Sequence, residues 1–270
     1  MEVYEWGHRE NPTIVCLHGM GSTGLSFGEL ANLLLPDFHV VAFDLPGHGS
    51  SEPLSEELDY RPGRLAERIA AAIEKLGKSK VYLMGHSWGA HLALFYAKDY
   101  PVQIEGVILL DGGYFQLEDR GNALKKELEN VEAFYETVRF PSWEAFIESE
   151  KSELPRWSDE LEAASRAQVI EKDGEIRLKV TPFTCKAVLK GIYAEPIGSV
   201  FSQIHTPVLL LRSTLPSEME DSRQEAAHKL HTEIPDAEVH PIADTTHDIY
   251  RDAPAETAKI IKNWVSRRKD

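Results

Sequence analysis

The sequence contains few cysteines, no long hydrophobic run and fewer basic than acidic residues. Only Cys16 and Cys185 are cysteines among its 270 residues, which is too few for a framework of disulfide bonds. No apolar stretch approaches the length needed to cross a bilayer. The first residues contain no basic segment followed by an apolar one, so we expect no secretory signal. These absences predict a cytoplasmic protein.

The charge balance disfavours several kinds of partner. The chain has 29 Lys and Arg residues against 44 Asp and Glu residues, a formal net charge of −15. Nucleic acids and anionic membranes attract clustered basic residues, so neither is an expected partner. The sequence also lacks a cluster of metal-ligand residues and the glycine-rich pattern that binds dinucleotides, so we predict no metal and no cofactor. The oligomeric state cannot be inferred from these features.

Short apolar segments alternate with amphipathic helical patterns along most of the chain. This alternation is typical of an α/β fold in which a mostly parallel sheet has helices on both faces. The last two helices are expected from Ser217, with Ser217 and Glu220 forming a capping box, and from Pro254. The predicted strands are residues 13–17, 39–43, 81–84, 106–110, 208–211 and 237–242.

The alternation is interrupted between residues 112 and 206. This segment is rich in charged residues, aromatic residues and helical patterns, and an Asp173-Gly174 turn predicts a small hairpin within it. We therefore divide the chain into a core, residues 1–111 and 207–270, and a helical cap, residues 112–206. Ligands bind at the carboxyl ends of the strands in open α/β sheets, where such a cap would lie. The alternative is a helical excursion whose aromatic residues fill only its own core.

The most informative motif is Gly85-His-Ser87-Trp-Gly89, which follows an apolar strand and precedes a helical pattern. In this context Gly-x-Ser-x-Gly forms a sharp strand-to-helix turn that exposes the serine hydroxyl. Side chains at the two glycine positions would collide with the neighbouring strand and helix. The N-terminus of the following helix favours negative charge close to the serine. Ser87 is therefore the candidate nucleophile.

Four motifs together resemble the α/β-hydrolase fold family, in its serine-nucleophile, carboxylesterase-like branch. Their order and spacing fit that family over nearly the whole chain, although the N-terminus leaves little room for the usual first strands. The resemblance implies a cap inserted after the sixth strand. The four motifs are His18-Gly-Met-Gly21, Asp44-Leu-Pro-Gly-His-Gly-Ser50, Gly85-His-Ser-Trp-Gly89 and Thr246-His247-Asp248.

The resemblance implies a catalytic base and an oxyanion hole. A serine hydroxyl needs an adjacent base to act as a nucleophile at neutral pH. His247 lies between the last strand and the last helix, where this family places its catalytic histidine. The backbone N–H groups of Met20 and Trp88 are expected to stabilise the oxyanion.

The carboxylate that orients the base has two candidate positions. In most members of the family it follows the strand before Arg212, but residues 212–216 contain no acidic residue. Glu218 and Glu220 come next, in the expected first turn of a helix, where the helix dipole favours acidic residues anyway. Asp111 follows the strand 106–110, and some haloalkane dehalogenases of this fold carry their acid there. We predict Asp111, with Glu218 and then Glu220 as alternatives.

These residues predict a serine hydrolase that cleaves a carboxylic ester or related small acyl compound through an acyl-enzyme intermediate. Hydrolysis of C–C bonds, thioesters or lactones would use the same residues and differ only in the pocket. A hypothesis from another class is a receptor-like homologue that binds a ligand in the capped pocket without turning it over. An intact strained turn at Ser87 argues against this hypothesis.

Overall fold

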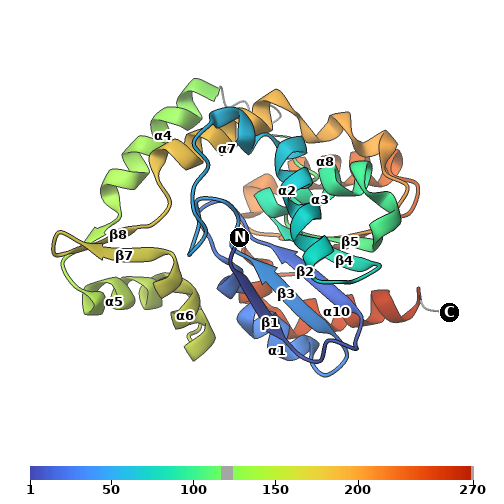
Figure 1. Cartoon of the computed structure of the whole chain (residues 1–270), viewed down its shortest axis with the longest axis horizontal. Coiled ribbons are helices and arrows are strands. Elements are labelled where there is room, and N and C mark those ends of the chain that lie inside the picture. Colours follow the sequence, from blue (N-terminus) through green and yellow to red (C-terminus); the bar gives the residue numbers. More distant parts are fainter. Residues whose placement is uncertain (117–123, 269–270) are drawn as a thin grey trace.

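A seven-stranded sheet forms the centre of the molecule in the computed structural model, which describes residues 1–116 and 124–268 (Figure 1). The strand order is β1-β3-β2-β4-β5-β9-β10; β1 pairs antiparallel with β3, and all other pairs are parallel. The predicted α/β fold with a mostly parallel sheet is therefore confirmed. The strands are β1 (Val3–Trp6), β2 (Thr13–Leu17), β3 (His39–Phe43), β4 (Val81–His86), β5 (Ile104–Leu110), β9 (Val208–Arg212) and β10 (Ala237–Pro241).

Helices cover both faces of this sheet, and the strands are apolar on both faces for that reason. In β2, Val15 and Leu17 belong to the cluster under α2, α3 and α8, whereas Ile14 and Cys16 belong to the cluster under α1 and α10. Successive side chains of a strand point to opposite faces, so each strand contributes to both cores. These helices are α1 (Gly28–Leu34), α2 (Pro62–Lys75), α3 (Trp88–Asp99), α8 (Glu220–Glu233) and α10 (Pro254–Ser266).

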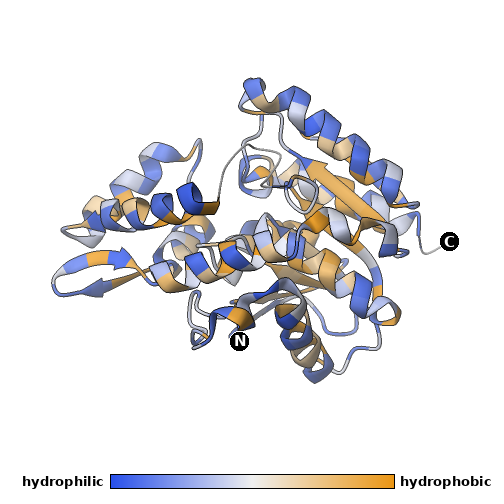
Figure 2. Ribbon diagram, turned by 90° about the horizontal axis from the view of Figure 1, so that it is seen from above, coloured by the Kyte–Doolittle hydropathy of each residue, from blue (hydrophilic) through white to orange (hydrophobic). Residues whose placement is uncertain are grey.

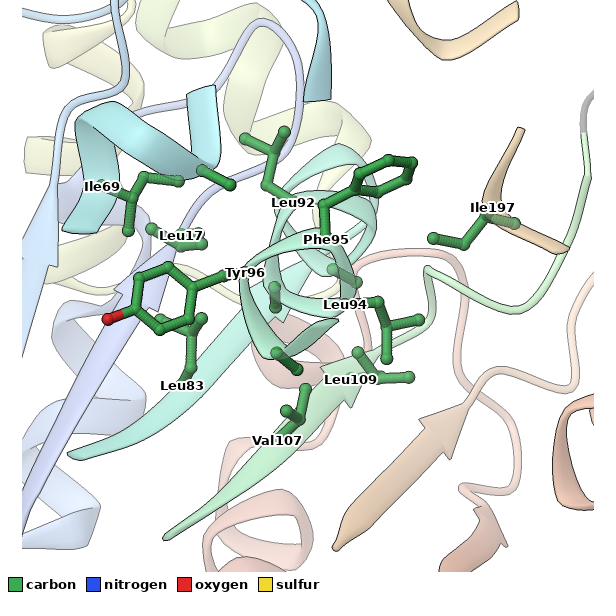
Figure 3. Packing of buried hydrophobic residues seen from close by; sticks show 14 of the residues in the cluster. Leu17, Ile69, Leu83, Leu92, Leu94, Phe95, Tyr96, Val107, Leu109 and Ile197 are labelled. Carbon is green, nitrogen blue, oxygen red and sulfur yellow. The ribbon is translucent and has the colours of Figure 1, made fainter. Parts of the chain in front are cut away.

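Figure 3 shows the larger of the two cores. Side chains of α3 pack on the strands: Tyr96 lies beside Leu83 of β4, and Leu94 lies beside Leu109 of β5. The helix α3 is buried along nearly its whole length, because it lies over the central strands. The residues that flank it in the sequence are consequently held in fixed positions above the end of β4.

The inserted segment lies between β5 and β9. It follows the fifth strand of the chain and not the sixth, because a single strand, β1, precedes β2. In Figure 2 its ribbon is blue over much of its length, whereas the visible strands of the large sheet are orange. Its described elements are α4 (Leu124–Thr137), β6 (Arg139–Phe140), α5 (Trp143–Glu153), α6 (Asp159–Ala167), β7 (Val169–Lys172), β8 (Glu175–Leu178) and α7 (Pro182–Ala194).

The inserted segment has its own small sheet and its own apolar cluster. Strands β7 and β8 form the expected antiparallel hairpin, and β6 pairs with β8. The hairpin turn has positive φ at both central residues, 55° at Asp173 and 77° at Gly174, which is the geometry that an Asp-Gly pair favours. Phe146, Ile147 and Ile176 are among the buried residues of its cluster. The aromatic residues of this segment therefore partly fill its own core.

The expected capping box at Ser217 is wrong. Residues Ser217–Met219 form a short 3₁₀ turn, and α8 begins at Glu220 with no side-chain cap on its first turn. The Glu220 carboxylate instead accepts two hydrogen bonds, of 2.9 and 2.8 Å, from the guanidinium of Arg212. The ion pair of Glu220 with the largely buried Arg212 is stronger than the hydrogen bond that Glu220 would form with the exposed Ser217 N–H in a capping box.

No helix formed by residues 1–116 or 124–268 is both long and apolar enough to cross a membrane.

The packing around Trp264 predicts a large contribution to stability. Trp264 of α10 is fully buried, and its ring occupies the space in front of Gly106, where an added Cβ would lie 2.5 Å from it. We expect Trp264→Ala to lower the free energy of unfolding by about 3–5 kcal/mol, because the cavity cannot close completely. Urea unfolding measures the change. Phe134→Ala, at a side chain that is 62% exposed, is the control and should change stability little; an equally small effect at Trp264 would contradict the prediction.

Candidate active site

Ser87 lies at a strained turn between β4 and α3. Its backbone has φ 52° and ψ −114°, a conformation that costs free energy for a residue with a side chain. The turn is possible because Gly85 and Gly89 lack side chains. A Cβ on Gly85 would lie 2.3 Å from the Gly89 backbone, and a Cβ on Gly89 would lie 2.0 Å from the carbonyl oxygen of Leu17. The motif thus brings two backbones into contact and presents Ser87 at the carboxyl end of β4.

His247 and Asp111 meet above the same edge of the sheet. Asp111 follows β5, and His247 follows β10 and precedes the short helix α9 (Ile249–Asp252). His247 Nδ1 lies 2.8 Å from Asp111 Oδ2, although the two residues are 136 positions apart. His247 also lies beside the turn, since its ring centroid is 4.8 Å from that of His86. Ser87 and His247 line one pocket, and within the described part of the chain no hydrogen bond joins them directly.

Asp111 is buried and accepts hydrogen bonds on both oxygens. Oδ1 accepts from the Ser213 N–H and the Tyr114 hydroxyl, and Oδ2 accepts from the Ser213 hydroxyl, each at 2.9 Å. Burial raises the pKa of Asp111, but the bonds from His247 and Ser213 outweigh burial and bring the pKa below its ordinary value. Asp111 is therefore ionised at neutral pH and able to hold the His247 ring.

This arrangement fixes the tautomer of His247. An ionised carboxylate can only accept, so Nδ1 of His247 must donate its proton to Asp111. In the neutral ring the other nitrogen, Nε2, then carries a lone pair and can accept a proton. The His247 side chain is 50% exposed, so this nitrogen is accessible from the pocket.

The two alternative carboxylates lie elsewhere. Glu218 is exposed in the 3₁₀ turn before α8, and Glu220 is paired with Arg212. The loop after β9, which contains no acidic residue, has a different part in the site. Its Ser213 contributes two hydrogen bonds to Asp111. The structure thus brings His247 together with Asp111 and with neither glutamate.

The residues predicted to form the oxyanion hole flank the nucleophile. Met20 lines the pocket, and Trp88 is the first residue of α3, so its N–H has no acceptor within the helix. The two loops lie close together, since a Cβ on Gly19 would be 2.9 Å from His86 Nδ1 and 3.2 Å from Ser87 Cβ. A glycine is therefore needed beside Met20 for the backbone to approach the serine.

Two histidines that the sequence placed merely in motif loops support the site. His86 Nε2 donates to the His247 carbonyl at 3.0 Å, which ties the histidine loop to the nucleophile turn. His18 Nδ1 donates to the Gly19 carbonyl at 2.8 Å, and its Nε2 accepts from the Leu45 N–H at 2.9 Å. Burial lowers the pKa of both histidines to about 4, so both are neutral at pH 7. The sequence motifs do not show that these two histidines are buried, so their supporting contacts could not be predicted from them.

Gly112 is another residue that sequence analysis did not single out. A Cβ at this position would lie 2.4 Å from the Ser87 carbonyl oxygen and 2.5 Å from its Cα. The backbone after Asp111 therefore passes directly behind the nucleophile. A glycine after the acid residue was the available signal for this close approach.

The pocket above Ser87 has a volume of about 440 Å³. One wall comes from the core loops, which contribute Met20, Ser87 and His247, and the other comes from the inserted segment. Among residues 1–116 and 124–268, no group of three His, Cys, Asp or Glu side chains is placed to hold a metal ion. The inserted segment contributes mainly apolar side chains to the pocket, namely Val131, Phe134, Tyr135, Leu178, Val180, Pro182 and Leu189.

Comparisons with known proteins agree with this architecture. The family model described as alpha/beta hydrolase fold matches residues 12–254. A serine hydrolase-like protein of Homo sapiens is 32% identical over 126 residues, which cover 47% of this chain and 59% of that protein. The match thus spans little more than half of that relative's length. The 2-(acetamidomethylene)succinate hydrolase of Mesorhizobium japonicum is 24% identical over 254 residues, covering 94% of this chain and 88% of that enzyme.

Solved structures share the fold over nearly the whole chain. The crystal structure of E-2-(acetamidomethylene)succinate hydrolase has a TM-score of 0.79 at 22% identity, covering 98% of this chain and 94% of that one. At this level of identity the likeness concerns the fold.

The buried histidines around the turn predict a loss of stability in weak acid. Burial lowers the pKa of His18 and His86 to about 4 and that of His48 to about 3, below the ordinary value of 6.5. As the pH falls below about 6.5, the unfolded chain therefore binds protons that the folded protein excludes. Each histidine should then reduce the free energy of unfolding by roughly 1.4 kcal/mol per pH unit until its folded pKa is reached.

Urea unfolding from about pH 6 to pH 4.5 measures this slope. His48→Gln keeps a donor for the Pro46 carbonyl, which His48 Nδ1 bonds at 3.1 Å, but removes the titrating ring. We expect its slope to be shallower by up to about 1.4 kcal/mol per pH unit. His228→Gln, on the exposed side of α8, is the control and should keep the wild-type slope. Equal slopes for all three proteins would refute the assignment.

Proposed function

Because the chain belongs to the α/β-hydrolase fold family, we propose that it is a serine hydrolase with Ser87 as nucleophile, His247 as base and Asp111 as the orienting acid. The observation that best supports the proposal is the 2.8 Å bond between Asp111 and His247, on a pocket that Ser87 also lines. The bond orients a base beside a serine held in a strained turn. A site with these three residues performs acyl transfer.

The reaction follows from the positions of the proton donors and acceptors. Ser87 Oγ attacks the acyl carbon while its proton passes to His247 Nε2, and the positive charge that forms on the ring is stabilised by Asp111. The N–H groups of Met20 and Trp88 stabilise the negative charge on the acyl oxygen. His247 then donates the proton to the leaving group. Water, activated by the same nitrogen, releases the acyl group from Ser87.

The substrate class that we propose is a carboxylic ester of a small acyl compound. A pocket of about 440 Å³ whose outer wall is mainly apolar suits a compound with a compact apolar part. Residues 112–206 act as a cap in this proposal, because Phe134, Leu178 and Leu189 of that segment line the pocket. Hydrolysis of thioesters, lactones or C–C bonds would use the same three residues and would differ only in the pocket.

Removing the nucleophile tests the proposal directly. Ser87→Ala is expected to abolish hydrolysis of p-nitrophenyl acetate, because it removes the hydroxyl that we propose forms the acyl-enzyme. A fluorophosphonate probe should label the wild-type protein at Ser87 and leave the variant unlabelled. Undiminished turnover in the variant rules out the mechanism, and a wild-type protein that resists both the ester and the probe would instead favour a ligand-binding protein.

A matched pair of variants tests the choice of acid. Asp111→Asn keeps the size of the side chain but cannot hold His247 in the required tautomer, so kcat should fall by about 10³–10⁴-fold. Glu218→Gln makes the same chemical change at an exposed residue and should leave kcat near the wild-type value. Steady-state kinetics with circular dichroism as a check on folding measures both. A large loss in Glu218→Gln with a small loss in Asp111→Asn would reverse the assignment.

A further inference from the structure

Arg251 is a cation in the pocket that the proposed mechanism does not use. It belongs to α9, four residues after His247, and it lines the same pocket as Ser87 and His247. Its backbone is fixed, because its N–H donates to the Asp248 carbonyl at 2.7 Å and its carbonyl accepts a hydrogen bond from Arg156. The position of the Arg251 backbone is thus set by the core and by the inserted segment together.

The guanidinium of Arg251 has no partner in the described part of the chain. Its Nε and one of its Nη atoms are buried without a hydrogen bond, and no described carboxylate forms an ion pair with it. A guanidinium stays charged at all physiological pH values, and buried donors without acceptors are costly. Such a group at a pocket wall is stabilised when an anion enters.

The carboxylate whose charge is coupled to Arg251 is already occupied. Both oxygens of Glu29 accept hydrogen bonds from the guanidinium of Arg156. Burial raises the pKa of Glu29, but the bonds from Arg156 and the charges of Arg156 and Arg251 bring it below its ordinary value. Both arginines are close enough for their charges to affect Glu29, but only Arg156 forms hydrogen bonds with its carboxylate. Turning the Arg251 side chain toward the pocket would break no hydrogen bond within the described residues.

We infer that Arg251 binds a carboxylate of the substrate, so that the enzyme prefers acyl compounds with an anionic end. This inference rests on the proposed function. The fork of an arginine matches a carboxylate in two parallel hydrogen bonds, which fixes the orientation of the substrate as well as its affinity. The protein has a net charge of −15, and Glu127 and Asp248 also line the pocket, so an anionic substrate needs the Arg251 cation to bind near Ser87. The apolar wall from the inserted segment takes the remainder of the molecule.

Two pairs of esters test the inference. The first pair is p-nitrophenyl hydrogen glutarate and its methyl ester, which differ in a carboxylate on the acyl side. The second is m-butyryloxybenzoate and its methyl ester, which differ in a carboxylate on the leaving group. The readout is the ratio of kcat/KM for the anionic ester to kcat/KM for the neutral ester. In at least one pair we expect Arg251→Met to lower this ratio by about ten- to a hundredfold, and Arg251→Lys to lower it less.

Arg64→Met is the matched control. It removes the same charge from a side chain that is 64% exposed on α2, outside the pocket, and should change the ratio by less than about twofold at physiological salt. An unchanged ratio in Arg251→Met for both pairs, or an equal fall in Arg64→Met, overturns the inference. Failure of the proposed function is distinguishable, because Ser87→Ala would then still hydrolyse the esters. If hydrolysis requires Ser87 but Arg251→Met leaves the ratio unchanged, the anion site is refuted and the proposed serine hydrolase is not.

Discussion

The hydrogen bond between Asp111 and His247 is the interaction on which the site depends. It joins the end of β5 to the loop after β10, and it fixes which ring nitrogen of His247 faces the pocket. The bond is possible because Ser213, from the loop after β9, satisfies both oxygens of the buried carboxylate. The segments that follow β5, β9 and β10 thus meet at the Asp111 carboxylate. Its charge remains stable in a buried position because each oxygen has donors of its own.

Close backbone packing and neutral histidines complete this arrangement. Gly85 and Gly89 allow the serine turn to close on itself and to contact the end of β2, and Gly112 allows the segment after β5 to pass directly behind Ser87. His18 donates a hydrogen bond to the Gly19 carbonyl, and His86 donates one to the His247 carbonyl. Burial keeps both imidazole rings uncharged. The result is a closely packed frame around Ser87. Two of the three residues that we propose for catalysis have positive φ, 52° at Ser87 and 42° at Asp111. Strain of this kind persists where the surrounding structure over-determines the backbone.

The inserted segment and the core share the pocket. The bond of Arg156 to Glu29 and to the Arg251 carbonyl ties the loop between α5 and α6 to α1 and α9. This contact places a fixed backbone and an unpaired guanidinium at the junction of the two parts. The three residues that we propose for catalysis come from the core alone, whereas residues of both parts line the pocket. In our proposal the chemistry is supplied by the core, and the selectivity depends on both parts of the chain.

The sequence by itself determined the alternation of strands and helices, the turn at Ser87 and the hairpin at Asp173-Gly174, because hydrophobic period and glycine position act locally. It favoured Asp111 as the acid but left Glu218 and Glu220 as alternatives, because the choice depends on which strand end lies next to His247. The capping box at Ser217 failed for the same reason: Arg212, eight residues before Glu220 in the sequence, takes the carboxylate once β9 and α8 pack together. The tertiary structure alone decided the contacts of Ser213, the buried state of His86 and the unpaired Arg251. Burial and pairing are properties of segments brought together by the fold, and no local pattern records them.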